Sequence, residues 1–299
     1  MNFEQSLTLA GLIPRDIVAD GRIRRCRTEL KPGKRNGWYV LHPDGHGAWG
    51  DWTSGSGEAL GHWNDDRATH GAVSAETQAR MQRQREQERK ARIQAMRSAR
   101  DFWDRARPLS RPHPYIERKG LSPLGCGGLR QHDGLLVIPV RNGEWITSIQ
   151  TITPEGEKRF WPGAPVKGGH HIIQREKSAL VAFCEGLATG LAVYQSVRAA
   201  SVVVAFDAGN LLPSLQTVKP SGAVVFCADN DHGTQARRGM NPGLEKARNA
   251  AELVGAGVAW PTGIEGTDWA DALAEYGQGG AKKIERQILA GARYVVNTS

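Results

Sequence analysis

Short apolar segments alternate with helix-favouring segments through the last part of the chain, and this alternation limits the fold more than any other feature. The apolar segments, rich in β-branched residues, are 179–184, 201–206, 223–228 and 257–260. The segments that favour helices are 187–197, 211–218 and 242–253. Strands that alternate with helices build parallel sheets covered by helices on both faces. We therefore predict an α/β fold for residues 179–299.

Acidic residues follow three of these predicted strands. Glu185 follows the first strand, Asp229 and Asp231 follow the third, and Asp268 and Asp271 come after the fourth. In an open parallel sheet, functional groups collect at the carboxyl ends of the strands. If the first and third strands are neighbours, Glu185 lies close to Asp229 and Asp231. The two-residue spacing lets Asp229 and Asp231 point the same way from an extended backbone.

The carboxylates of Glu185, Asp229 and Asp231 predict a metal site. Three converging carboxylates repel one another unless a cation neutralises them, and Mg²⁺ prefers such oxygen ligands. A site of this kind is typical of metal-assisted phosphoryl or nucleotidyl transfer. Each acid alone has a simpler interpretation, because a glutamate after a strand often caps a helix and Asp-Asn-Asp is common in turns. Their joint placement at strand ends favours metal binding.

The order of these motifs resembles the Toprim domain shared by bacterial-type primases, topoisomerases and some nucleases. Residues 185–190, Glu-Gly-Leu-Ala-Thr-Gly, are similar to the Glu-Gly-X-Ala-Thr motif of phage and plasmid primases. The resemblance implies a catalytic set of Glu185, Asp229 and Asp231 that binds Mg²⁺, with Mn²⁺ as a substitute. Residues 268–271, Asp-Trp-Ala-Asp, resemble the late acidic motif of the same group, which implies Asp268 and Asp271 as further metal ligands.

Residues 108–178 are expected to form a mixed α+β subdomain. Two apolar segments, 135–140 and 145–150, flank an Asn-Gly step at 142–143, which is a strong signal for a β-hairpin. Residues 114–121 resemble the entry to the basic subdomain that precedes the Toprim domain in bacterial-type primases. We expect the basic residues of this region to contact nucleotide and DNA phosphates. They are Arg118, Lys119, Arg130, Arg141, Lys158 and Arg159.

The start of the chain predicts two further parts. Residues 1–70 contain short aromatic segments between Gly- and Asp-containing turns, which predict a small β-rich domain. Residues 71–107 predict a solvent-exposed helical linker, because 75–107 contain no Gly or Pro and few apolar residues in their first two-thirds. Residues 20–52 look like the leader of plasmid and mobile-element primases. The four cysteines form no CxxC pair, so we expect neither a zinc ribbon nor bound zinc.

The charge of the chain agrees with a nucleic-acid partner. The 299 residues carry a formal net charge of +8, and the sequence pI is about 9.5. Together with the resemblance, this implies a cytoplasmic DNA primase in DNA replication. It would make short primers on single-stranded DNA from nucleoside triphosphates, within a primosome that includes a replicative helicase. No apolar run approaches the roughly 18–20 residues that span a bilayer, so we expect no membrane contact.

Two alternatives to a primase stay open. A Toprim-type metal-dependent nuclease would use the same carboxylates to hydrolyse a phosphodiester bond and would need no nucleoside triphosphate. A non-catalytic accessory protein of a mobile element would bind single-stranded DNA without chemistry. The first alternative is distinguished by cleavage of DNA, and the second by the absence of any product.

Overall fold

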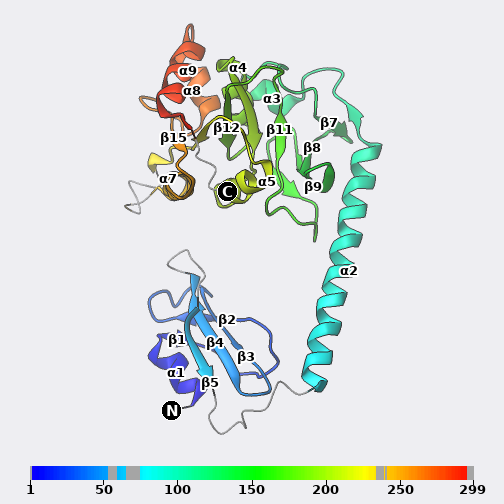
Figure 1. The fold of residues 1–299 in the computed structure, drawn as a ribbon, viewed down its shortest axis with the longest axis vertical. Coiled ribbons are helices and arrows are strands. Elements are labelled where there is room, and N and C mark those ends of the chain that lie inside the picture. Colours follow the sequence, from blue (N-terminus) through cyan, green and yellow to red (C-terminus); the bar gives the residue numbers. More distant parts are fainter. Residues whose placement is uncertain (1, 53–58, 65–74, 234–238, 240, 295–299) are drawn as a thin grey trace. The chain divides into compact units, whose positions relative to one another are not determined.

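The computed structural model describes residues 2–52, 59–64, 75–233, 239 and 241–294. The chain forms two compact units, residues 1–88 and 89–299, which are described separately (Figure 1). The boundary between them lies within the longest helix, α2 (Ala75–Arg105). No helix in the described ranges is both long enough and apolar enough to cross a membrane.

The first unit contains a five-stranded antiparallel sheet and the helix α1 (Phe3–Leu9). The helix begins with a capping box between Asn2 and Gln5, which satisfies backbone N–H groups of its first turn. Phe3 and Leu7 of the helix pack against Tyr39 in the core of this unit. The strands lie in sequence order: β1 (Leu12–Ile13), β2 (Arg24–Thr28), β3 (Gly37–Leu41), β4 (His46–Asp51) and β5 (Ala59–Asn64).

Helix α2 is exposed along its middle and packs into the second unit at its C-terminal end. Residues 82–92 are exposed apart from the half-buried Glu86. Ala99 and Trp103 are four residues apart and therefore share one helix face, which is buried against Val137 and Ile149. The middle of the helix is thus exposed to solvent, and its role as a linker stays a prediction. Its last turns belong to the hydrophobic core of the second unit.

The second unit contains a mostly antiparallel sheet that includes the predicted hairpin. The hairpin strands β8 (Leu135–Asn142) and β9 (Trp145–Ile152) are joined at the Asn-Gly step, where Gly143 has a φ of +58°. A short helix, α3 (Pro114–Arg118), precedes them. The sheet is completed by β6 (Arg107–Pro108), β7 (Arg130–His132) and β10 (Lys158–Phe160), in the order β10-β9-β8-β7-β6.

The third sheet is the parallel sheet predicted for the C-terminal part, with an antiparallel strand on each side. Its parallel strands lie in the order β13 (Ala200–Val204), β12 (Leu180–Cys184), β14 (Ala223–Cys227) and β15 (Gly257–Ala259). Strand β11 (His171–Ile173) pairs antiparallel with β13, and β16 (Arg293–Tyr294) pairs antiparallel with β14. The predicted strands begin and end within two residues of the observed ones, and the α/β fold class is confirmed.

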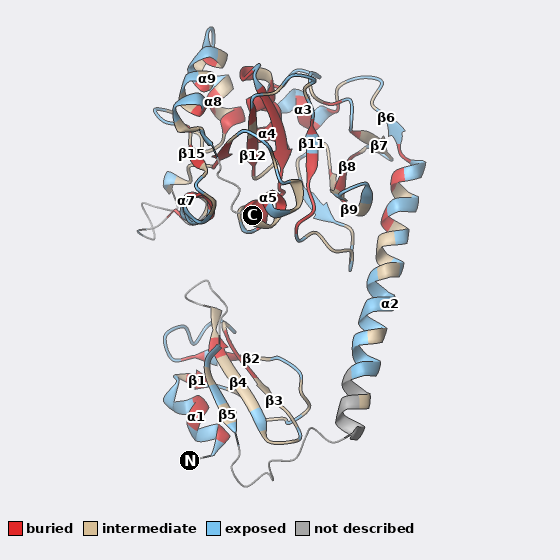
Figure 2. Ribbon diagram, in the orientation of Figure 1, coloured by how far each residue is buried: buried red, intermediate tan, exposed pale blue. Residues whose placement is uncertain are grey.

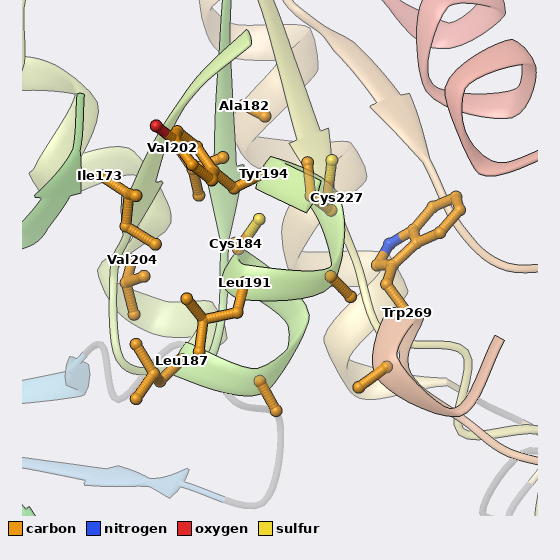
Figure 3. Close-up of a cluster of buried hydrophobic side chains, with 14 of the residues drawn as sticks. Ile173, Ala182, Cys184, Leu187, Leu191, Tyr194, Val202, Val204, Cys227 and Trp269 are labelled. Carbon is orange, nitrogen blue, oxygen red and sulfur yellow. The ribbon is translucent and has the colours of Figure 1, made fainter. Parts of the chain in front are cut away.

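Helices cover both faces of the parallel sheet. Cys184 and Val204 point towards α4 (Leu187–Ser196), α8 (Trp269–Tyr276) and α9 (Gly280–Gly291), where Leu191 and Trp269 are buried (Figure 3). Phe183 belongs to a second cluster with α5 (Leu211–Val218) and α7 (Pro242–Val254) on the other face. The strands are therefore apolar on both sides, as the continuous apolar segments predict.

One hydrophobic core connects the two sheets of the second unit. It extends from Tyr115 and Leu136 to Leu191 and Ile288, and the buried residues are concentrated in the central strands (Figure 2). Strand β11 lies within the range predicted for the mixed subdomain, yet it pairs with the parallel sheet. The division of the chain into 1–70, 71–107, 108–178 and 179–299 therefore stays a prediction.

Candidate active site

Two acidic residues meet where neighbouring strands of the parallel sheet end. Strands β12 and β14 pair in parallel with Cys184 opposite Cys227, so the predicted pairing of these strands is confirmed. Glu185 directly follows β12, and Asp229 lies two residues beyond the end of β14. The backbone N–H of Asp229 acts on the Glu185 carboxylate and lowers its pKa. The two carboxylates are thus brought to one edge of the sheet.

Glu185 has a strongly perturbed carboxyl group. Burial, followed by the negative charge of Asp229, raises the pKa of Glu185 to about 7. Its Oε1 is fully buried and accepts no hydrogen bond from any described residue. A Cβ placed on Gly243, in the first turn of α7, would lie 3.1 Å from this oxygen. Glycine at this position therefore leaves room beside the carboxylate.

Acidic and basic neighbours both change the pKa of Asp229. Burial raises the pKa of its carboxyl group to about 6, and the charge of Asp268 contributes in the same direction. Thr189 donates a hydrogen bond of 3.0 Å from its hydroxyl group to Oδ1 of Asp229. The positive charges of Lys158 and Lys119 partly offset the rise in pKa. Asp229 therefore lies at the centre of the acidic site.

The pair of Glu185 and Asp229 fits a hard divalent cation. The two half-buried carboxylates have raised pKa values because nearby lysine charges offset burial and the neighbouring acids only in part, and Oε1 of Glu185 has no hydrogen-bond partner among the described residues. Carboxylate oxygens are the ligands that Mg²⁺ and Mn²⁺ prefer. Within the described ranges, however, no three acidic, histidine or cysteine side chains are grouped closely enough to surround one ion. The ligands would be two protein carboxylates completed by water or substrate oxygens.

The predicted third ligand, Asp231, lies just beyond this pair. Asn230 between the two aspartates points away, because its Nδ2 donates to the carbonyl oxygen of Pro261 at 3.0 Å and its Oδ1 accepts from Asn241 at 3.1 Å. Asp231 is half-buried on the following turn. Its assignment as a metal ligand stays a prediction.

Asp268 and Asp271 have a structural function in the described fold. Asp268 caps helix α8 through a capping box that Asp271 completes. Both carboxylates also accept hydrogen bonds from Nζ of Lys119, at 3.0 Å for Asp268 and 3.1 Å for Asp271. These contacts occupy the two carboxylates and the Lys119 ammonium group together. The assignments of the two aspartates to metal and of Lys119 to DNA stay predictions.

Lys158 is the predicted basic residue whose charge acts most strongly on Asp229. Its positive charge lowers the pKa of Asp229. A Cβ on Gly186, the N-terminal cap of α4, would lie 3.6 Å from Nζ of Lys158. The neighbouring Arg159 instead forms an exposed ion pair of 2.7 Å with Glu157. The aromatic ring of Phe160 packs edge-on against Phe206 at 5.8 Å.

The other predicted basic residues lie in separate places. The guanidinium group of Arg118 lies 5.8 Å from the ring centre of Tyr115. Arg130 lies 4.3 Å from the ring centre of Trp103 and donates to its carbonyl oxygen at 2.8 Å. Arg130 and Arg141 both line a cavity of about 330 Å³ that also contains His171. Their contacts with DNA or nucleotide stay predictions.

Asp207 is an acidic neighbour of the site that the sequence patterns did not single out. It follows β13 by three residues, and its charge contributes to the raised pKa of Glu185. Phe206 before it has a φ of +74°, which is uncommon for an aromatic residue. The position of Asp207 directly after the second predicted strand, 201–206, is the sequence signal that could have identified it. Recognising it required the strand order, which places β13 beside β12.

Comparisons with known proteins agree with this geometry. The Toprim domain family matches residues 180–279, which contain both Glu185 and Asp229. Two curated proteins from Escherichia coli, both named DNA primase TraC, are 32% identical to this chain over 262 and 266 residues. Each alignment covers 82% of this chain, but only 24% and 18% of the respective relatives. The chain therefore spans about a quarter or less of their length.

Two solved structures also resemble the chain. One is a DnaG primase catalytic domain bound to single-stranded DNA, with a TM-score of 0.42 and 14% identity over 67% of this chain and 82% of that chain. The other is the primase fragment of the bacteriophage T7 primase-helicase protein, with a TM-score of 0.41 and 13% identity over 60% of this chain and 78% of that chain. The family match and the curated relatives confirm the resemblance seen in residues 185–190. Residues 180–279 thus match a Toprim domain, and the curated relatives that align with most of the chain are named DNA primases.

Proposed function

We propose that this chain is a DNA primase that synthesises short primers on single-stranded DNA from nucleoside triphosphates. The observation that carries the proposal is the half-buried pair of Glu185 and Asp229 at the carboxyl edge of a Toprim sheet, with a buried Glu185 oxygen that has no hydrogen-bond partner among the described residues. The names of the TraC relatives support the choice of primase over nuclease. The chain spans only part of the length of those relatives, so primase activity is proposed for this chain.

Glu185 and Asp229 would hold a divalent cation, with Mg²⁺ as the proposed ion and Mn²⁺ as a substitute. A bound divalent ion of this kind orients a triphosphate, lowers the pKa of an attacking hydroxyl group and stabilises the leaving pyrophosphate. We include Asp231 as a third ligand that completes the site when substrate is bound. Glu185, with a pKa of about 7, can also accept or return a proton near neutral pH.

The phosphates of the incoming nucleotide would lie between Lys158 and the N-terminus of α4. The cap residue Gly186 forms no side-chain hydrogen bond to the first turn, so the N–H groups of that turn remain available to an anion. A Cβ on Gly186 would lie 3.6 Å from Nζ of Lys158, which adds a full positive charge beside these donors. Both features favour a triphosphate next to the carboxylate pair.

The remaining predicted basic residues are proposed to contact the template. Arg130 and Arg141 line one cavity without an acidic residue among its lining side chains. Arg118 and Arg159 are further candidates on the same unit. A replicative helicase stays a proposed partner, which stimulation of primer synthesis by an added helicase would test.

The proposal is tested by a primer-synthesis assay on single-stranded DNA with labelled nucleoside triphosphates and Mg²⁺ or Mn²⁺. We expect new short oligonucleotides that disappear when EDTA is added. Shortened template without new oligonucleotides would identify the nuclease alternative. DNA binding without any product, with either metal, would identify the non-catalytic alternative and reject the proposed function.

A further inference from the structure

The first unit contains a strongly basic segment that the proposed catalytic site does not use. Residues 15–35 hold eight basic and three acidic residues, a net charge of +5 in a chain whose total is +8. The basic residues are Arg15, Arg22, Arg24, Arg25, Arg27, Lys31, Lys34 and Arg35. Such a local excess of positive charge attracts polyanions and is much denser than the average of the chain.

Strand β2 places part of this charge on the face of the sheet that lies opposite the hydrophobic core. Cys26 and Thr28 are buried, and Cys26 packs with Phe3 and Leu7 in the core. The alternating residues Arg25 and Arg27 are exposed. Because successive side chains of a strand point to opposite faces, the two arginines lie together on the outer face.

Aromatic residues hold Arg25 in place on this outer face. Its guanidinium carbon lies 4.3 Å from the ring centre of Trp52, and Trp52 in turn contacts Trp38 at 5.7 Å. Trp38 is opposite Arg25 in the pairing of β2 with β3. Its Nε1 is buried and donates to no described residue. A guanidinium group that is already positioned by an indole loses less conformational freedom when it binds a ligand.

A cavity lies at the outer edge of the same strand. It has a volume of about 530 Å³, and five arginines line it: Arg15, Arg24, Arg25, Arg27 and Arg35. Strand β1 pairs with β2 only at Leu12–Thr28 and Ile13–Arg27. On this side, the first residues of β2 therefore have no neighbouring strand and face the cavity. Asp16 is the one acidic residue of the lining, and Arg24 is paired with Asp20 at 2.7 Å. The lining therefore keeps a clear excess of positive charge.

We propose that this arginine-lined surface of the first unit binds the sugar–phosphate backbone of single-stranded DNA. Arginine forks match phosphate oxygens, and guanidinium planes stacked on aromatic rings also stack on unpaired bases. Unpaired bases are available in a single strand but not in a duplex. The inference rests on the proposed primase function in one respect, the choice of DNA as the single-stranded nucleic acid that is bound. It adds a second DNA-binding site, outside the Toprim domain.

The site is tested by fluorescence anisotropy of a labelled oligothymidylate with the full chain, in EDTA and without nucleotides. We compare the double variant R25A/R27A with a control, R198A/R286A, which removes the same charge from two exposed positions of the second unit. For single strands, the salt dependence of binding changes by about 0.7 per phosphate contact, so R25A/R27A should lower the slope by about 1.4. We expect its affinity to fall about 10–100-fold at low salt.

The control variant should bind within about twofold of wild type, since two unspecific surface charges contribute little. The conservative variant R25K/R27K keeps the charge and should restore the salt slope, which separates phosphate contact from a folding defect. Equal losses in R25A/R27A and R198A/R286A would overturn the proposal. So would an undiminished affinity of R25A/R27A for the single strand, or a loss confined to duplex DNA or to anionic vesicles.

The result is independent of primer synthesis. If wild-type protein makes no primers but R25A/R27A loses single-strand binding, the binding site stands and the proposed function fails. If primers are made and R25A/R27A binds like wild type, the proposed function stands and the binding site fails.

Discussion

The hydroxyl group of Thr189 donates a hydrogen bond of 3.0 Å to Oδ1 of Asp229 and so connects the first turn of α4 to the residues that follow β14. Thr189 is almost fully buried, at 2% exposure. Its hydroxyl group therefore orients the Asp229 carboxylate from within the packed core. The contact joins the Glu-Gly-X-Ala-Thr motif to the second acidic motif in space.

Substitution of Thr189 by valine should reduce primer synthesis while the fold is kept. Valine has nearly the same shape but cannot donate to Asp229, and loss of a group that orients a metal ligand typically costs about 10–100-fold in metal affinity or activity. The measurement is the Mg²⁺ concentration that gives half-maximal synthesis. Thr189→Ser retains the hydroxyl group and should stay near wild type. An unchanged Mg²⁺ requirement in Thr189→Val would show that the hydrogen bond does not serve the metal site.

Mg²⁺ should stabilise the wild-type protein against thermal unfolding, and Glu185→Gln should remove most of this stabilisation. An ion that binds only the folded state adds about 2.7 kcal/mol at one hundred times its dissociation constant. Without metal, Glu185→Gln should be at least as stable as wild type, because the repulsion between the Glu185 and Asp229 charges is removed. Melting curves with Mg²⁺ and with EDTA measure both effects. Equal Mg²⁺ stabilisation of the two proteins would exclude Glu185 as a ligand.

Lys158→Met should raise the KM for nucleoside triphosphates by about tenfold or more, because a hydrogen bond to a charged group contributes about 1.5–3 kcal/mol. Arg159→Met is the matched control, since Arg159 is exposed and paired with Glu157. Steady-state kinetics at saturating template isolate the nucleotide step. A larger effect of Arg159→Met than of Lys158→Met would show that the nucleotide lies on the other side of β10.

Substitutions of Asp268 distinguish its role as a helix cap from a role as a metal ligand. Asn is as good an N-cap as Asp, so Asp268→Asn should preserve α8, whereas Asp268→Ala should lower the free energy of unfolding by about 1–2 kcal/mol. Chemical denaturation measures this difference. If Asp268→Asn instead abolishes the stabilisation by Mg²⁺, Asp268 is a ligand as the late acidic motif implies.

His171 should make the protein less stable in mild acid. Burial lowers the pKa of His171 to about 4 in the folded state, whereas an unfolded histidine titrates near 6.5. Between these values the unfolded state binds the additional proton, so the free energy of unfolding falls with pH from about 6.5 down to 4, by up to about 3 kcal/mol. His171→Gln should lack this loss, and the exposed His46→Gln should keep it. A constant difference between wild type and His171→Gln from pH 7 to pH 4.5 would contradict the assignment.

Much of the second unit could be predicted from local patterns. The hairpin at residues 142–143 follows from a two-residue turn that only a few dipeptides adopt easily. The strand that ends at Cys184 and the helix that begins at Leu187 follow from apolar segments whose lengths suit a strand and a helix. Helices α8 and α9 were not predicted; Gly277 ends the first and Gly279 precedes the second.

The candidate site was predictable only in part. Glu185 and Asp229 directly follow the predicted strands 179–184 and 223–228, so the sequence indicates them as candidates. Asp207 was missed because its closeness to Glu185 depends on β13 lying beside β12. The ion pairs of Lys119 with Asp268 and Asp271 join residues about 150 positions apart, and no local pattern predicts such a contact.

The sequence by itself determined most strands of the parallel sheet, the hairpin and several helices, and it placed Glu185 and Asp229 after strands, because periodicity and turn chemistry act over a few neighbouring residues. Only the tertiary structure decided which strands are neighbours and how deeply each carboxylate is buried. Those two facts set the pKa values of Glu185 and Asp229, since burial and the charge of a residue distant in sequence both act through space.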